Sequence, residues 1–205
     1  MKRLLMLLLV VCALPLAAQS NDATVWISRQ MNDDGGRIAP DEDVETRLDD
    51  GGGFGVSVSR MFTTRISGEL ALFRTSSSAR LVSGPTARLE LGELDLTPAM
   101  AMARYHFLPG RTVDVYVGGG LAHVLADDLD SADLREAGIA PVRIENRTTT
   151  AFGAGLLVSL TSRAGLALDA RYIPLEVSAR VAGDDERVDV NIDPLLISFG
   201  FRVRF

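Results

Sequence analysis

The sequence predicts an all-β protein, specifically an eight-stranded antiparallel up-and-down transmembrane β-barrel with short periplasmic turns and long extracellular loops. Three observations predict this fold class. A secretory signal begins the chain, bulky apolar residues alternate with small or polar ones over long stretches, and the connections between those stretches alternate in length. A period of two is typical of strands with one apolar and one polar face.

Residues 1–18 have the three parts of a secretory signal peptide. Lys2 and Arg3 form the positive start, an almost unbroken apolar run follows, and Ala18 offers a small residue for cleavage. The apolar run is too short to cross a bilayer as a helix. We therefore expect cleavage after Ala18 and a mature barrel domain of residues 19–205.

Charge and cysteine content exclude several classes of protein. Cys12 is the single cysteine and lies in the signal, where Val11 before it is not the small residue that lipoprotein processing requires. The mature domain therefore needs no disulfide and can form no thiolate metal site. Loss of Lys2 and Arg3 leaves 19 basic against 27 acidic residues, a net charge of −8. An acidic chain without a basic block is not expected to bind nucleic acid.

The alternation predicts eight strands, several of them as long as the roughly 9–11 residues that a tilted strand needs to cross a bilayer. Soluble strands are shorter, about 5–6 residues. The predicted strands are residues 23–30, 52–60, 65–74, 95–107, 113–125, 148–160, 165–181 and 188–205.

The predicted connections sort by length. Long polar ones (31–51, 75–94, 126–147) alternate with short ones (61–64, 108–112, 161–164), and 182–187 is of medium length. A barrel with tight turns on one side and long loops on the other gives this order. Within the third long loop, residues 132–137 are expected to form one helical turn.

The final strand carries the most specific pattern. Every second residue from Leu195 to Phe205 is bulky and apolar, whereas the residues between them include two arginines. On a soluble protein such an exposed apolar face would promote aggregation. In a membrane the same face can contact lipid. An apolar face that ends in a terminal Phe also matches the signal that the outer-membrane assembly machinery prefers, and we assign that signal to Phe201, Val203 and Phe205.

The other face of the strands is expected to line the lumen, which in an eight-stranded barrel is just wide enough for side chains or one small ligand. Charges of both signs there should pair, and the apolar members favour a small hydrophobic solute; a lumen plugged by its own side chains is the alternative. The predicted lumen-lining residues are Phe73, Met100, Met102, Arg104, Asp114, Tyr116, Asp169, Arg171, Leu196 and Arg202.

No catalytic residue or cofactor is predicted. Some eight-stranded barrels are hydrolases with a serine two residues after a histidine, but Leu108 and Leu125 stand at that spacing from His106 and His123. Both histidines are expected at the membrane interfaces. Glycine clusters such as 118–120 sit inside strand patterns and are not followed by a helix, so we interpret them as space for lumen side chains, not as phosphate loops.

An acidic cluster in the third long loop is the one candidate for metal binding. Asp127, Asp128, Asp130 and Asp133 could bind a divalent cation weakly. The glycine and terminal glutamate of a calcium loop are missing, so we interpret the cluster as a solvated loop and predict no metal site.

Several stretches together resemble the OmpW family of eight-stranded outer-membrane proteins. The matching stretches, in chain order, are 96–107, 115–120, 151–155, 170–172 and 190–205, and the Ile192-Asp193-Pro194 step before the last strand is especially similar. The resemblance implies an outer-membrane barrel without enzymatic activity that takes up small hydrophobic molecules.

Three functional hypotheses follow. The first is a barrel that binds or conducts small hydrophobic molecules across the outer membrane. The second is a structural or adhesive barrel whose loops contact lipopolysaccharide, host surfaces or phage. The third is a soluble periplasmic lipid-binding barrel, which requires the apolar strand faces to point inward. The expected partners are outer-membrane lipids, lipopolysaccharide, the assembly machinery and a small hydrophobic solute.

Overall fold

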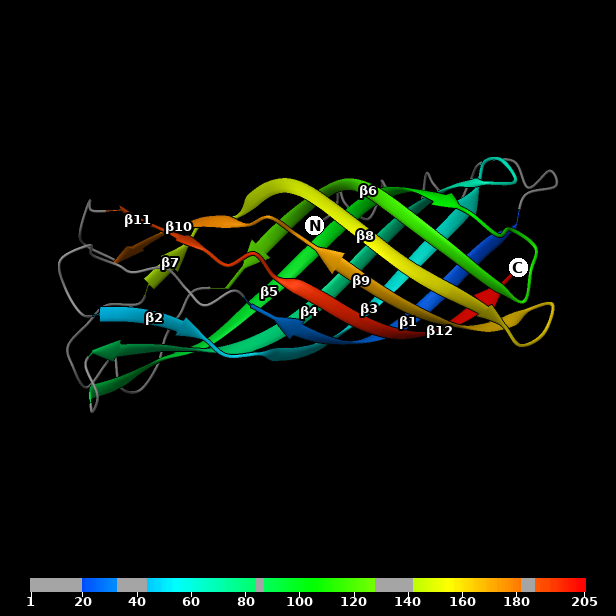
Figure 1. Cartoon of the computed structure of the whole chain (residues 1–205). Helices are drawn as coiled ribbons and strands as arrows, with labels where there is room; N and C mark the ends of the chain where they lie inside the picture. The colour runs from blue at the N-terminus through cyan, green and yellow to red at the C-terminus, as the bar shows by residue number, and fades with distance from the viewer. Residues whose placement is uncertain (1–19, 33–43, 84–86, 128–141, 182–186) are drawn as a thin grey trace.

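The long alternating stretches form the eight strands of a closed antiparallel barrel, which we call its staves (Figure 1). The structure is a computed structural model that describes residues 20–32, 44–83, 87–127, 142–181 and 187–205. The eight barrel strands are β1 (Asn21–Met31), β3 (Gly51–Met61), β4 (Ile66–Ser83), β5 (Ala87–His106), β6 (Val113–Ala126), β8 (Arg147–Ser159), β9 (Ala164–Tyr172) and β12 (Leu195–Arg204).

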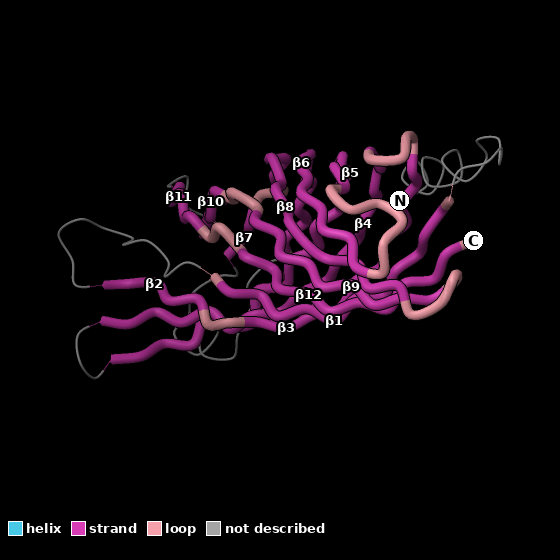
Figure 2. The backbone as a smooth tube through the Cα atoms, turned by 45° about the vertical axis from the view of Figure 1, so that its right-hand side comes forward, coloured by secondary structure: helices cyan, strands magenta, loops and turns pink. Residues whose placement is uncertain are grey.

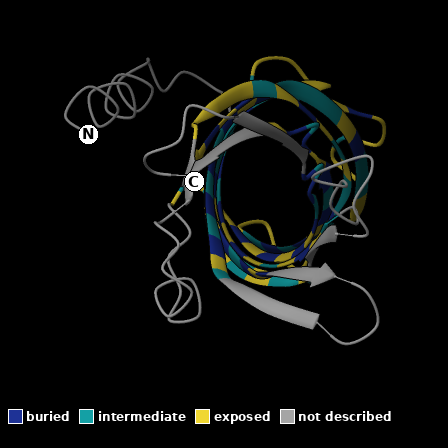
Figure 3. Cartoon of the chain, turned by 90° about the vertical axis from the view of Figure 1, so that its left-hand side faces the viewer, coloured by how far each residue is buried: buried dark blue, intermediate teal, exposed yellow. Residues whose placement is uncertain are grey.

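Each barrel strand pairs with its neighbour in the chain, and β12 pairs with β1 to close the ring. The view along the axis shows this closure (Figure 3). Because closure leaves no free edge, every stave has two hydrogen-bonded neighbours. The predicted eight-stranded up-and-down barrel is therefore confirmed.

The two ends of the barrel differ. Three short turns at one end, residues 62–65, 107–112 and 160–163, confirm the predicted short connections, and Ser20 and Phe205 lie at this same end. We call it the turn end, and the opposite end the loop end. Four further strands stand at the loop end (Figure 2), namely β2 (Val44–Leu48), β7 (Val142–Ile144), β10 (Glu176–Val181) and β11 (Arg187–Asn191).

The predicted long connection at 75–94 is wrong, because most of it is strand. β4 continues to Ser83 and β5 begins at Ala87, and the two stay paired with one register shift after Ala79. Both faces of this extension are polar or mixed, so the apolar alternation that marked the strands fades although the hydrogen-bond ladder continues. The predicted loops at 31–51 and 126–147 likewise contain β2 and β7.

The two predicted strands at the C-terminal side are each broken in two. The stretch 165–181 splits into β9 and β10 around Pro174, and 188–205 splits into β11 and β12 around Pro194. Proline cannot donate to a ladder, so the barrel strand ends on one side of it. β10 then pairs with β11 and β7 in a separate three-stranded sheet. The predicted signal peptide and the helical turn at 132–137 lie outside the described residues.

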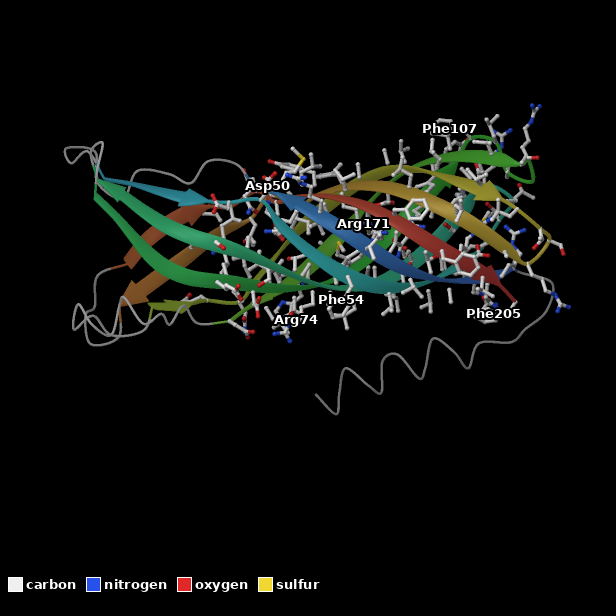
Figure 4. All side chains as sticks on the ribbon, turned by 90° about the horizontal axis from the view of Figure 1, so that it is seen from below. Asp50, Phe54, Arg74, Phe107, Arg171 and Phe205 are labelled. Atoms are coloured by element: carbon white, nitrogen blue, oxygen red, sulfur yellow. The ribbon has the colours of Figure 1, made fainter. Side chains whose placement is uncertain are left out.

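Apolar side chains form a band around the outside of the staves. The exposed members include Val25, Ile27, Phe54, Val56, Leu72, Val117, Leu121, Phe152, Leu168, Ile197, Phe199, Phe201 and Val203. Figure 4 shows Phe54, Phe107 and Phe205 projecting away from the barrel, whereas Arg171 lies within it. The apolar faces therefore point outward, which contradicts the soluble lipid-binding hypothesis. No helix in the described ranges is long and apolar enough to cross a membrane.

Glycines make room for the large aromatic side chains inside. A Cβ on Gly55 would stand 2.5 Å from Cδ1 of Phe73, and one on Gly200 would stand 2.6 Å from Cε3 of Trp26. Both distances are shorter than real contacts allow, so only glycine permits these rings to lie flat on the neighbouring strand. Gly55 and Gly200 thus make space for lumen side chains, the role that the sequence predicted for glycines inside strands.

Candidate functional site

The lumen is the candidate site, and its side chains come from alternate residues of all eight staves. The strand register determines which residues lie opposite each other in neighbouring strands. Trp26 lies opposite Gly200 on one side and Gly55 on the other, and Arg104 lies opposite Ser67 and Gly118. A one-residue slip would exchange the lumen and lipid faces, so the outward apolar band holds the inward set in place.

A network of charged side chains crosses the middle of the lumen. Glu69 of β4 forms ion pairs with Arg104 of β5 and with Arg171 of β9, the second at 3.2 Å between Oε2 and Nη2. Arg171 Nε also lies 2.5 Å from Oδ1 of Asp169. The hydroxyl of Tyr116 on β6 donates a hydrogen bond to Asp169. Four staves are thus tied together through groups that are almost completely buried.

Aromatic rings cover this network on both sides. The guanidinium of Arg171 lies 4.8 Å from the ring centre of Phe73 and 5.2 Å from that of Trp26. The guanidinium of Arg104 lies 4.6 Å from the ring centre of Tyr116. Cation–π contacts of this kind gain strength where water is excluded. The network and its rings, from here on the charged layer, therefore close the lumen as a compact barrier.

A polar vestibule of about 760 Å³ opens below the charged layer, at the turn end. Its charged lining includes an ion pair of 3.1 Å between Arg204 Nε and Asp22 Oδ1. Arg202 donates a 3.1 Å hydrogen bond to Ser159 and lies 3.7 Å from Asp22. His106 and Asp114 also line it.

A hydroxyl, an imidazole and a carboxylate form a chain beside the vestibule. Ser67 Oγ lies 2.8 Å from Nε2 of His106, and Nδ1 of His106 lies 2.7 Å from Oδ2 of Asp114. The order resembles that of a nucleophile relay. However, Ser67 is only 2 % exposed and does not line the vestibule. The chain therefore ties β4, β5 and β6 together and presents no reachable nucleophile.

The other half of the lumen, between the charged layer and the loop end, is apolar. We call it the loop half. Its buried apolar side chains include Leu94, Leu96 and Met100 of β5, Ala122 and Val124 of β6, Ala151 of β8 and Leu196 of β12, with Phe73 at its floor. Barrel interiors are normally polar. An apolar half is therefore a specific feature of this lumen.

Two short segments cover the loop half. They follow β9 and precede β12, and they contribute the buried side chains Ile173, Leu175 and Ile192. Ile173 N donates to Pro194 O at 3.1 Å, and Ile192 N donates to Leu175 O at 2.9 Å. Asp193, with a positive φ of 40°, accepts a 2.7 Å hydrogen bond from Leu175 N. The Ile-Asp-Pro step thus builds the cover over the apolar half.

The model of the OmpW family matches residues 23–205, nearly the whole described chain. The chain belongs to the OmpW family. As a member of this family it is an outer-membrane protein, with its turn end in the periplasm and its loop end at the cell surface, as in barrels of this architecture. The apolar band around the OmpW-family barrel accordingly faces lipid.

Solved structures share the same fold at low sequence identity. OprG of Pseudomonas aeruginosa is 16 % identical over 91 % of this chain and 95 % of its own, with a TM-score of 0.76. AlkL, determined in lipid bilayers, is 22 % identical over 91 % of this chain and 90 % of its own, with a TM-score of 0.62. The Escherichia coli outer membrane protein W is 16 % identical over 93 % of this chain and all of its own, with a TM-score of 0.56. No curated protein matches the sequence.

In this OmpW-family barrel all ten residues predicted to line the lumen have inward side chains. The apolar ones, Phe73, Met100 and Leu196, lie in the loop half, and Met102 lies beside the charged layer. Arg104, Tyr116, Asp169 and Arg171 meet in the charged layer, whereas Asp114 and Arg202 belong to the vestibule. Phe201, Val203 and Phe205 are exposed on the outside.

The sequence reasoning missed many lumen residues, among them Asp22, Trp26, Glu69 and His106. Glu69 stands four residues before Phe73, and His106 two residues after Arg104, so the period of two around predicted lumen residues places both inside. The expected interface position of His106 is therefore wrong, because its side chain is buried in the lumen; His123 is exposed. No spacing within one strand could have shown that Ser67 of β4 meets His106 of β5.

Ion pairs mark the loop-end edge of the apolar band. Arg29 lies 2.9 Å from Asp50, and Arg74 lies 2.9 Å from Asp95. A hydrogen bond from Ser76 and the positive charge of Arg74 hold the pKa of Asp95 below its usual range.

Asp127, from the predicted acidic cluster, lies 3.7 Å from Arg74, and the other three members fall outside the described residues. The described residues hold no group of acidic, histidine or cysteine side chains that suits a metal.

Proposed function

We propose that this non-enzymatic barrel takes up small hydrophobic molecules from the cell surface into the loop half of its lumen. The apolar lining of that half supports the proposal, because a water-filled pore would need polar walls. Its floor of Phe73 and Met100 and its wall of Leu96 and Leu196 have no charged member. A solute that binds there replaces contacts between apolar side chains with contacts to its own apolar surface. This exchange costs little free energy.

The charged layer argues against a straight path to the periplasm. An apolar solute would have to separate Glu69 from Arg104 and Arg171, and breaking such buried pairs costs several kcal/mol. We therefore propose that a bound solute leaves sideways, into the lipid.

The β4–β5 wall has a weak point that suits this exit. The ladder pairs Leu72 with Ala99 and Thr75 with Leu96, but the residues between these pairs, 73–74 on β4 and 97–98 on β5, are not paired. Pro98 has no N–H to give to β4. Because Pro98 lies between Leu96 and Met100, the gap is at the level of the loop half.

Uptake of a labelled alkane into proteoliposomes tests the proposal. We expect Met100→Arg and Leu96→Arg to abolish uptake, and Met102→Phe to reduce it, while the barrel still migrates faster on a detergent gel without boiling. Pro98→Ala, which restores an N–H to the wall, should also reduce uptake. The lipid-facing variant Leu168→Ala is the matched control. Uptake that is indifferent to Met100→Arg and Leu96→Arg would contradict the proposal.

A structural or adhesive role is the second candidate, and the long loop-end strands favour it. β4 and β5 have 18 and 20 residues, far more than a bilayer needs, and the loop end of β4 pairs with β2. Ion pairs such as Arg29–Asp50 stand where lipopolysaccharide head groups are expected. Deletion of residues 126–147 would then abolish cell-surface attachment, whereas Met100→Arg would leave it intact.

The outward strand β12 suits recognition by the outer-membrane assembly machinery. Phe201 and Val203 are about half exposed, and Phe205 is more so, at 69 %. We propose that these three residues form the assembly signal. Their joint replacement by serine should leave the protein unfolded in the periplasm, whereas serine at Leu72 and Leu168 should not.

A further inference from the structure

Three polar atoms in the apolar loop half have no partner. They are Oε1 of Gln30, Oγ1 of Thr75 and Oγ of Ser77, and none of them finds a hydrogen bond within the part of the chain that the structure describes. The three side chains are only 1 %, 1 % and 4 % exposed. A buried polar atom without a partner costs about 1–3 kcal/mol. Three of them in one place therefore point to a ligand group that supplies the missing bonds.

The strand register brings these atoms to one patch of wall. Gln30 of β1 pairs with Gly51 of β3, and Ser77 of β4 lies on the other side of this glycine, with its Cβ 2.9 Å from where a Cβ on Gly51 would stand. Thr75 is two residues from Ser77, about 6.6 Å along the same strand, and faces Gly53. A Cβ on Gly53 would stand 2.7 Å from Thr75 Cγ2, so only glycine leaves room for the Thr75 side chain here. Its neighbours in the adjoining strands are Leu196 beside Gln30, Leu96 beside Thr75 and Leu94 beside Ser77.

Neighbouring hydrogen bonds fix the orientation of the Gln30 amide. Asn32 donates its Nδ2 to the carbonyl of Asp49 at 2.8 Å, so its Oδ1 faces Gln30. Only the nitrogen of Gln30 can donate to that oxygen, which it does at 2.6 Å. Oε1 of Gln30 therefore points away from Asn32 as a pure acceptor. Thr75 and Ser77 add two hydroxyls, each able to donate or accept.

We infer that the loop half binds neutral apolar molecules that carry a hydroxyl group, such as medium-chain primary alcohols. This inference rests on the proposed uptake function and names its substrate class. An alcohol O–H donates to Gln30 Oε1, and the alcohol oxygen accepts from Thr75 or Ser77. A carboxylate cannot donate to Gln30, and no described side chain of the loop half carries a positive charge to pair with it. A plain alkane leaves all three atoms unpaired.

The apolar tail of such a ligand extends toward the floor of the loop half. Gln30 and Trp26 are four residues apart on β1, about 13 Å along the strand. Trp26 packs against Phe73, with 6.4 Å between ring centres, and it is the single tryptophan of the chain. Its fluorescence therefore reports a quencher at the end of the tail.

The test measures quenching of Trp26 by three brominated probes, added to the full-length mature protein in lipid nanodiscs. The probes are 8-bromo-1-octanol, 1-bromooctane and 8-bromooctanoate, each corrected for its partition into the lipid. We expect the alcohol to quench at about tenfold lower concentration than the other two, the value of one net hydrogen bond. In the triple variant Gln30→Met, Thr75→Val and Ser77→Ala, this preference should vanish while 1-bromooctane quenches as before.

The triple variant is expected to fold, because apolar groups of similar shape replace atoms that had no partner. The control is Ser28→Ala with Ser198→Ala, which removes two hydroxyls that already bond each other at 2.7 Å one row below. This control should keep the alcohol preference. Equal quenching by alcohol and alkane, a preference for the carboxylate, or a triple variant that keeps the preference would overturn the inference. Failure of all three probes to quench Trp26 would instead overturn the proposed uptake function itself.

Discussion

The two halves of the lumen share one wall but differ in interior chemistry. Below the middle, Glu69, Arg104 and Arg171 pair across the barrel, and every charge there depends on another strand. Above it, apolar side chains such as Leu96 and Leu196 are buried without any directional bond. Charged pairs have one satisfactory arrangement, whereas apolar contacts can be exchanged for those of a solute. The charged layer therefore forms a closed floor, whereas the loop half above it can adapt to a bound solute.

Removal of Glu69 is expected to have the largest effect. Glu69→Leu leaves Arg104 and Arg171 buried without their shared carboxylate and should lower the free energy of unfolding by about 3–5 kcal/mol. Urea unfolding in lipid vesicles, followed by Trp26 fluorescence, measures this. The double variant Glu69→Leu with Arg104→Met keeps Arg171 paired with Asp169 and should recover most of the loss. Equal loss in single and double variants would show that charge pairing is not the cause.

A cavity in the loop half should cost less and be repairable. Leu96 is 1 % exposed, so Leu96→Ala should lower the free energy of unfolding by about 2–3 kcal/mol. A saturating apolar solute such as octane binds only the folded barrel and should restore part of the loss. The same solute should not rescue Glu69→Leu beyond its effect on the wild type. Rescue of both variants alike would remove the distinction between the halves.

The cover over the loop half should show a smaller effect. Asp193→Ala removes the acceptor for Leu175 N and places alanine at a φ of 40°, at a cost of about 1–2 kcal/mol. Asp193→Asn keeps an acceptor and tolerates this φ, so it should cost less. We expect Asp193→Ala to speed solute entry in the Trp26 quenching assay. An unchanged entry rate would exclude these segments as the cover.

The smallest effect is expected at the surface pair outside both halves. The pKa of Asp95 is lowered in the folded state by Ser76 and Arg74, so its contribution to stability is present above the ordinary carboxyl pKa of about 3.9. It is lost as the pH falls through the lower pKa of the folded state. Asp95→Asn should flatten the pH dependence of stability in this acid range, and high salt should weaken the effect. A pH dependence unchanged by Asp95→Asn would refute this assignment.

The sequence was sufficient for the barrel because its two faces meet different solvents. Alternation identifies a strand where one face meets lipid, as from Ile197 to Val203, and it fades where the outward face no longer meets lipid, as beyond Thr75. Strand breaks at Pro174 and Pro194 were visible as prolines, but the separate sheet that follows each break depends on pairing between distant segments.

Individual lumen residues could be predicted from the sequence, but their arrangement could not. Arg104 and Arg171 could be placed inside from their alternation with apolar residues. Their shared partner Glu69 comes from another stave, and only the register shows that they meet. The sorting of charged and apolar residues into two halves likewise depends on the stagger of eight strands. The three unpaired atoms of Gln30, Thr75 and Ser77 become visible only once all their neighbours are placed.

Methyl NMR of the barrel in nanodiscs tests the division of the lumen most directly. Leucine and isoleucine methyl groups are observed while octane is added. We predict shifts at Leu96, Leu196 and Ile173 in the loop half that exceed those of lipid-facing Leu72, and none at Leu157 in the vestibule. Shifts confined to Leu72, or equal shifts at Leu96 and Leu157, would contradict an apolar binding region closed off by a charged layer.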